Sequence, residues 1–137
     1  MAEFISNNMM MVAIFVMSGL MLVWPEIQRL FLGGAPELST LDATRMMNQD
    51  AVVVDVREHT EFSAGHLPRA RGIPLGDLEK RLGELERFKD KPVILVCANG
   101  MRSRAGARLL RQKEFKQVFN LRGGFAEWLK AALPTEK

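Results

Sequence analysis

The segment from Cys97 to Ser103 holds the side chains best suited to chemistry. Its cysteine, the only one in the chain, follows an apolar run at residues 92–96 and precedes a helical pattern. A sulfur atom at that junction faces the free N–H groups of the helix start, whose partial positive charge favours an anion. Because the thiolate is the reactive form of cysteine, this position predicts a nucleophile.

The rest of the segment has the composition of an anion-binding loop. Small residues, and one that tolerates positive φ, let several backbone amides turn inward over the sulfur, and the arginine also favours a thiolate. The residues predicted to hold a charged sulfur are Ala98, Asn99, Gly100, Met101, Arg102 and Ser103. In the alternative interpretation Cys97 is a small hydrophobic residue that closes a buried strand, the commonest role of a lone cysteine. The Asn-Gly-x-Arg-Ser continuation favours the reactive role.

Several stretches, in matching order and spacing, resemble rhodanese-like sulfurtransferases. The Cys-x-x-Gly-x-Arg-Ser loop after an apolar strand is similar to the active loop of that family. The further stretches are Asp55-Val56-Arg57-Glu58, Glu61-Phe62, Gly65-His66-Leu67-Pro68 and the Gly-Gly-x-x-x-Trp segment within 121–128. The resemblance covers residues 36–133 and departs from the family at 69–72, where Arg-Ala-Arg-Gly replaces the usual Gly-Ala-x-Asn.

The resemblance implies sulfur transfer through a persulfide on Cys97. The thiolate would take sulfane sulfur from thiosulfate or a persulfide and pass it to a thiol or other thiophilic acceptor. Arg102 would steer the anionic donor and stabilise the departing anion. One alternative is a cysteine phosphatase, but those related loops are one residue longer and the chain has no clear general acid. The other is a non-catalytic rhodanese-like module that binds a protein or carries sulfur at the membrane.

The remaining motif residues are expected to give structural support. Asp55 is predicted to end a strand by accepting hydrogen bonds from the following turn, and Arg57 shares its face. His66 is interpreted as a buried hydrogen-bonding residue that fixes the turn before Pro68. Trp128 is predicted to close the core from a short helix.

The single cysteine also limits the chemistry around it. It excludes an intramolecular disulfide and fits a thiol that is kept reduced. It excludes an internal resolving cysteine as well, so a separate thiol acceptor has to discharge the persulfide. Neither a metal nor a cofactor is expected.

The N-terminal segment predicts a membrane anchor. Residues 4–25 are 22 residues without a formal charge. As a helix they would cover roughly 33 Å, against a bilayer core of about 30 Å. A cleaved signal peptide is the alternative, but neither an early base nor a good cleavage site is present. Arg29 on the C-terminal side favours a single-pass protein with its domain in the cytoplasm. The expected division is an anchor at 1–33 and a rhodanese-like domain at 34–137.

Alternating strand-like and helix-like stretches predict an α/β fold with a mainly parallel sheet flanked by helices. Residues 51–56 and 92–96 are continuous apolar runs, typical of strands buried on both faces. Ser39 is expected to cap a helix that runs toward Met47. Leucines at helical spacing within 77–91 indicate a core-facing stripe, and Ala105, Gly106, Leu109 and Leu110 are expected to form another.

The charge distribution favours small anionic substrates over nucleic acid. Residues after Gly33 include 18 basic and 14 acidic side chains, and seven of the bases lie within 102–122. Such an excess near the loop would steer anions, although an ordinary solvated helix face has the same composition. No interleaving of bases with aromatic residues is present, so nucleic acid binding is not expected.

Overall fold

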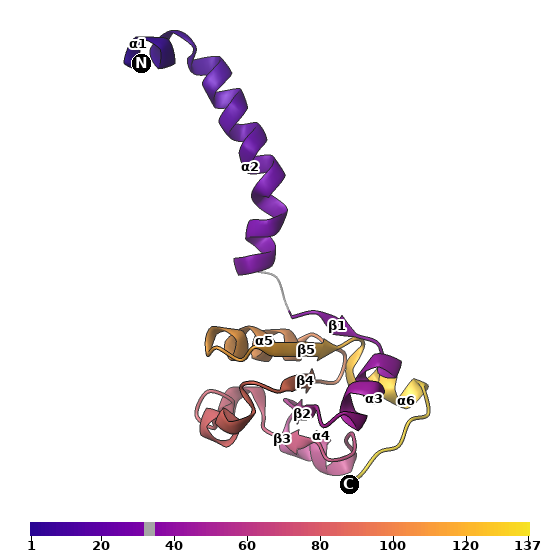
Figure 1. The fold of residues 1–137 in the computed structure, drawn as a ribbon. Helices are drawn as coiled ribbons and strands as arrows, with labels where there is room; N and C mark the ends of the chain where they lie inside the picture. Colours follow the sequence, from indigo (N-terminus) through magenta and orange to yellow (C-terminus); the bar gives the residue numbers. More distant parts are fainter. Residues whose placement is uncertain (32–34) are drawn as a thin grey trace. The chain divides into compact units, whose positions relative to one another are not determined.

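The computed structural model describes the backbone of residues 1–31 and 35–137, and the side chains of 1–28 and 35–137. The chain divides into two units, residues 1–33 and 34–137 (Figure 1). The first is helical, and the second is an α/β domain that contains the cysteine loop.

The described residues of the N-terminal unit, 1–31, form two helices, α1 (Ala2–Asn7) and α2 (Met9–Phe31). The apolar segment predicted at 4–25 is therefore interrupted at Asn8, whose Nδ2 donates to the Phe4 carbonyl at 2.9 Å. Asparagine side chains compete with helical hydrogen bonds in this way. Pro25 lies inside α2 and does not end it.

Most of α2 is apolar and exposed. Its stretch Met9–Gln28 has 20 residues with a mean hydropathy of 1.9, and none of the stretch is buried within the structure. By length and composition this helix could cross a bilayer. A helix of this kind near an N-terminus serves either as a membrane anchor or as a signal sequence.

The described part of the domain contains one parallel sheet with the strand order β1-β5-β4-β2-β3. Its strands are β1 (Glu37–Leu38), β2 (Val52–Asp55), β3 (Arg71–Gly72), β4 (Pro92–Val96) and β5 (Gln117–Leu121). The apolar runs predicted as buried strands are β2 and β4, which pair at the centre. Parallel strands end at the same edge, so the loops that follow β2, β4 and β5 lie together there.

Packing on both faces of the sheet confirms the predicted architecture. Along β4, Val93 and Leu95 belong to one buried cluster, and Ile94 and Val96 belong to the other. This is the alternation expected of a strand. The first cluster includes residues of α5 (Arg102–Gln112) and of the turns at 75–88, and the second includes residues of α3 (Thr40–Asn48) and α6 (Gly124–Lys130).

Local signals predicted the start of α3 correctly but not the structure of residues 77–91. Ser39 caps α3 as predicted, its Oγ accepting from the Asp42 N–H at 3.1 Å. Residues 77–91 form short 3-10 turns instead of one helix, with Leu78 and Leu85 as their buried residues. Glycines within 75–91 weaken a longer helix there.

The buried stripe of α5 differs from the predicted one. Ser103, Gly106, Ala107 and Leu110 are buried, whereas Ala105 is exposed. These buried positions follow the spacing of three and four that one helix face requires. The prediction was therefore wrong for Ala105 and missed Ala107.

Leu95→Ala tests the central packing. Leu95 is fully buried in β4, so its truncation is expected to lower the free energy of unfolding by about 2–5 kcal/mol. The measurement is urea denaturation of the full chain in mild detergent. Leu129→Ala, at an exposed leucine of α6, is the control and is expected to change stability by about 0.5 kcal/mol or less. Equal losses in the two variants would contradict this account of the core.

Candidate active site

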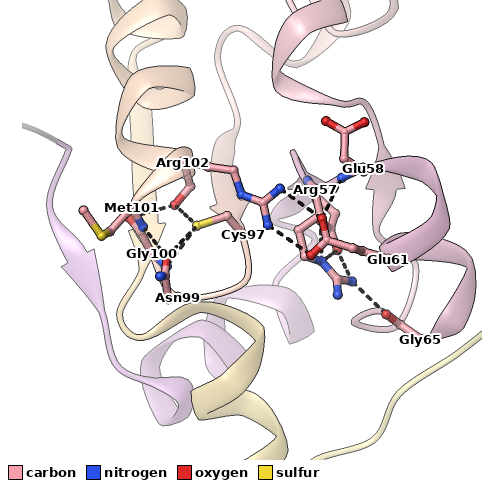
Figure 2. Close-up of polar contacts among 11 residues, drawn as sticks. Arg57, Glu58, Glu61, Gly65, Cys97, Asn99, Gly100, Met101 and Arg102 are labelled. Carbon is pink, nitrogen blue, oxygen red and sulfur yellow. Dashed lines mark hydrogen bonds and ion pairs between the residues drawn. The ribbon is translucent and has the colours of Figure 1, made fainter.

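Cys97 lies between the end of β4 and the start of α5, at the carboxyl edge of the sheet. The residue is fully buried. Its Sγ accepts a hydrogen bond from the Gly100 N–H at 2.9 Å (Figure 2). The Ser103 Oγ lies 3.3 Å from the same sulfur. As a thiol it can donate to the Asn99 Oδ1 at 4.0 Å. The sulfur is therefore buried among polar partners as well as core side chains.

The loop differs from the predicted ring of amides over the sulfur. Gly100 has a φ of 91°, which turns its N–H toward the sulfur and is readily adopted only by glycine. The Met101 N–H instead donates to the Asn99 Oδ1 at 3.1 Å. An asparagine side chain commonly captures the amide two residues on. The Asn99 side chain thus holds one amide that was expected to face the sulfur.

A second loop, after β5, holds the carbonyl groups of the cysteine loop. The Phe125 N–H donates to the Cys97 carbonyl at 2.7 Å, and the Ala126 N–H donates to that of Ala98 at 3.0 Å. Gly124 has a φ of 61°, and a Cβ there would overlap the Cys97 carbonyl oxygen. The Gly-Gly segment of the sequence therefore allows α6 to approach the cysteine loop this closely.

Asn120 of β5 supports the loop from behind, and sequence analysis missed it. The side chain is buried. Its Oδ1 accepts from the Ser103 Oγ, and its Nδ2 donates to the Gly100 carbonyl at 3.1 Å. The available signal was a polar residue within the apolar strand Gln117–Leu121, next to Phe119 and Leu121.

Arg102 is paired with Glu61 of α4 (His59–Ala64), a role that sequence analysis also missed. The guanidinium Nη1 and Nη2 donate to the two carboxylate oxygens at 2.9 and 3.0 Å (Figure 2). These hydrogen bonds lower the pKa of Glu61, and the carboxylate raises the pKa of Arg102. The charge of Cys97 also contributes to the raised pKa of Arg102. The arginine expected to attract anions therefore already has a carboxylate partner.

The residues expected to give structural support contact α4 and its flanking turns. The Arg57 guanidinium donates to both carboxylate oxygens of Asp55 and to the Gly65 carbonyl, at 2.7–3.0 Å. His66 Nδ1 hydrogen-bonds to the Phe62 carbonyl at 2.9 Å, and its ring stacks on that of Phe62. The contacts to Gly65 and Phe62 hold the C-terminal end of the helix that presents Glu61.

Asn120→Asp tests the support of the loop. The change keeps the shape but removes the N–H donor to Gly100 and adds a buried negative charge near Cys97, which disfavours a thiolate. We expect alkylation of Cys97 by iodoacetamide to slow by about tenfold.

Gln117→Glu is the matched control, since Gln117 lies on the same strand but is exposed. It is expected to react like the wild type. The alkylation rate is followed by mass spectrometry, and circular dichroism checks that each variant is folded. An unchanged rate in folded Asn120→Asp would contradict the role given to Asn120.

Known proteins are similar to this chain in sequence and in fold. Residues 39–131 match the model of the rhodanese-like domain. YqhL of Bacillus subtilis is 45% identical over 78 residues, which are 57% of this chain and only 60% of YqhL. The thiosulfate sulfurtransferase GlpE of Glaesserella parasuis is 36% identical over 101 residues, covering 73% of this chain and 92% of GlpE.

A solved structure agrees with the sequence relatives. The rhodanese-related protein from Thermoplasma volcanium superposes with a TM-score of 0.67 at 27% identity, covering 74% of this chain and 97% of that protein. The family model, the relatives and the parallel sheet agree, and the chain therefore belongs to the rhodanese-like domain family.

Proposed function

We propose that this protein is a sulfurtransferase that carries sulfane sulfur as a persulfide on Cys97. The observation that carries the proposal is the environment of Sγ, which lies at a strand-to-helix junction against the Gly100 N–H and the Ser103 hydroxyl. A hydrogen-bond donor and a helix start favour an anionic sulfur at that position. The similarity to GlpE, named as a thiosulfate sulfurtransferase, supports the same reaction class.

The reaction has two displacement steps. In the first, the Cys97 thiolate attacks the outer sulfur of the donor, a new S–S bond forms, and the old bond to that sulfur breaks. Its electron pair leaves with sulfite when the donor is thiosulfate, or with a thiolate when the donor is a persulfide. In the second, an acceptor thiolate attacks the outer sulfur of the Cys97 persulfide and releases the Cys97 thiolate.

The residues of the loop have different roles in these steps. The Gly100 N–H stabilises negative charge on the sulfur without reorganisation, because the backbone already points there. Ser103 lies beside the sulfur, and its hydroxyl proton is donated to the Asn120 Oδ1, which ties the loop to β5. Arg102 interacts with the charge of Cys97 and is the cation nearest to an incoming anion in this proposal.

The acceptor is a separate molecule, because Cys97 is the only cysteine. A thiol on another protein or a small thiol fits this requirement. The full burial of Cys97 favours a second candidate, a rhodanese-like module that binds a partner without turning over sulfur. The two candidates differ in whether the sulfur reacts.

Mass spectrometry of the intact protein distinguishes these candidates. After incubation with thiosulfate or a low-molecular-weight persulfide, the full chain is expected to gain one sulfur atom, which cyanide removes. Cys97→Ser is expected to gain none, because it lacks the attacking sulfur. If folded wild-type protein gains no sulfur from either donor, the binding module becomes the better account.

We also propose that the apolar N-terminal segment, predicted at residues 4–25, anchors the protein in a bilayer with its domain in the cytoplasm. The length of the apolar stretch of α2 and the exposure of its side chains support this role. A reduced thiol at Cys97 supports the cytoplasmic side.

Membrane fractionation tests the anchor. The full chain is expected to stay in the membrane pellet after alkaline carbonate washing, with residues 1–33 still present by intact mass. Protease is expected to digest the domain in inside-out vesicles without detergent, and in right-side-out vesicles only after detergent is added. Loss of the N-terminal segment from the mature chain would instead identify a signal sequence.

A further inference from the structure

The ion pair between Glu61 and Arg102 differs from the other arginine–glutamate contacts of the domain. The pair joins residues 41 positions apart, on α4 and at the start of α5. Arg81 and Glu84 form a similarly bidentate pair, but within one short turn. Glu37 also pairs with two distant arginines, but through single contacts at 3.2 and 3.4 Å. Stabilisation of a single helix therefore does not explain this bidentate contact, which joins two separate elements beside the reactive sulfur.

Glu61 is itself held in place by its own helix. Its Oε1 accepts from the Glu58 N–H at 3.2 Å, which forms part of the capping box of α4. Arg57 binds the Gly65 carbonyl at the other end of this helix, at 2.7 Å. The carboxylate is therefore presented to Arg102 by a fixed segment of backbone.

The pair changes the charge that an incoming donor meets. Arg102 alone would place one positive charge beside Cys97, whose own charge contributes to the raised pKa of the arginine. The Glu61 carboxylate offsets this positive charge, so the pair as a whole is neutral. Each negative charge on a donor then gains less from Arg102, so a dianion loses more than a monoanion does.

Building on the sulfur transfer proposed above, we propose that Glu61 is a specificity-determining residue that lowers the reactivity of the site toward dianionic sulfur donors. Acting through Arg102, it makes singly charged donors, the class to which simple persulfides of thiols belong, better substrates relative to thiosulfate. Glu61 does not touch the reacting sulfur in this account. It is a positioning residue for the guanidinium.

Two small donors with the same leaving chemistry isolate the effect of charge. Thiosulfate is a dianion, and methanethiosulfonate is a monoanion in which a methyl group replaces one oxyanion. With either donor the Cys97 thiolate forms an S–S bond to the outer sulfur, and the bond from that sulfur to the sulfonyl sulfur breaks. The electron pair leaves with sulfite or with methanesulfinate, so charge balances in both cases.

The experiment compares Glu61→Gln with wild type in the full chain. The second-order rate constant of persulfide formation is measured by mass spectrometry with each donor at one fixed ionic strength, because salt screens these charges. The ratio of the thiosulfate rate to the methanethiosulfonate rate is expected to rise about fivefold or more in Glu61→Gln. Glu84→Gln disrupts the bidentate Arg81–Glu84 pair and is expected to leave the ratio at the wild-type value.

Alkylation supplies a readout that does not need sulfur transfer. The ratio of the iodoacetate rate to the iodoacetamide rate at Cys97 compares an anionic with a neutral reagent. This ratio is expected to rise in Glu61→Gln, to fall in Arg102→Gln and to stay constant in Glu84→Gln. A purely structural role for Glu61 would change both rates together and leave both ratios unchanged.

The outcomes separate this inference from the proposed function. If wild type forms no persulfide with either donor, the proposed function fails, and the alkylation ratio still decides whether Glu61 sets the charge preference. If wild type forms a persulfide but Glu61→Gln keeps the wild-type ratios, the inference about Glu61 is wrong and the proposed function stands.

Discussion

The site depends on hydrogen bonds that join two neighbouring strand-to-helix loops. The carbonyl groups of Cys97 and Ala98 accept from the Phe125 and Ala126 N–H groups at the start of α6. A carbonyl oxygen that faced the sulfur would repel a thiolate, so binding both carbonyls elsewhere leaves the Gly100 N–H as the partner of Sγ. This contact requires close approach of two backbones, and Gly124 permits it because a Cβ there would overlap the Cys97 carbonyl oxygen.

The sheet order explains why these loops meet. On one side of β4, Leu95 pairs with Asn120 of β5, so the supporting carboxamide and the start of α6 follow directly. On the other side, Val96 pairs with Asp55 of β2, and the Val56 N–H donates to the Val96 carbonyl at 2.9 Å. The chain then enters α4, which presents Glu61. Because all these strands are parallel, every one of these groups is delivered to the same edge of the sheet.

Sequence could predict what depends on neighbouring residues, but not what depends on contacts between distant ones. The apolar runs of β2 and β4, the Ser39 cap and the family motifs are local patterns, and the structure and comparisons confirm the fold that they indicate. Asn120 and Glu61 acquire their roles only when β5 and α4 are brought beside the loop, which no local pattern specifies. The competition of Asn99 for an amide depends on the exact turn geometry. Turn geometry also determines the structure of residues 77–91, where the spacing predicted one helix and the chain forms short 3-10 turns. Leu78 and Leu85 of the predicted stripe are buried there, whereas Leu82 and Phe88 are only partly buried.

The arrangement separates the factors that ionise the sulfur from those that select its substrate. Sγ is buried, so its negative charge depends on a donor that is already oriented, the Gly100 N–H. This N–H acts without reorganisation, and its contribution does not depend on the net charge of the incoming sulfur compound. The side chains of Arg102 and Glu61 are both over one third exposed. An approaching anion therefore interacts with the net charge of this pair. A change at Glu61 can therefore alter which donor is preferred while the backbone that holds the sulfur stays as it is.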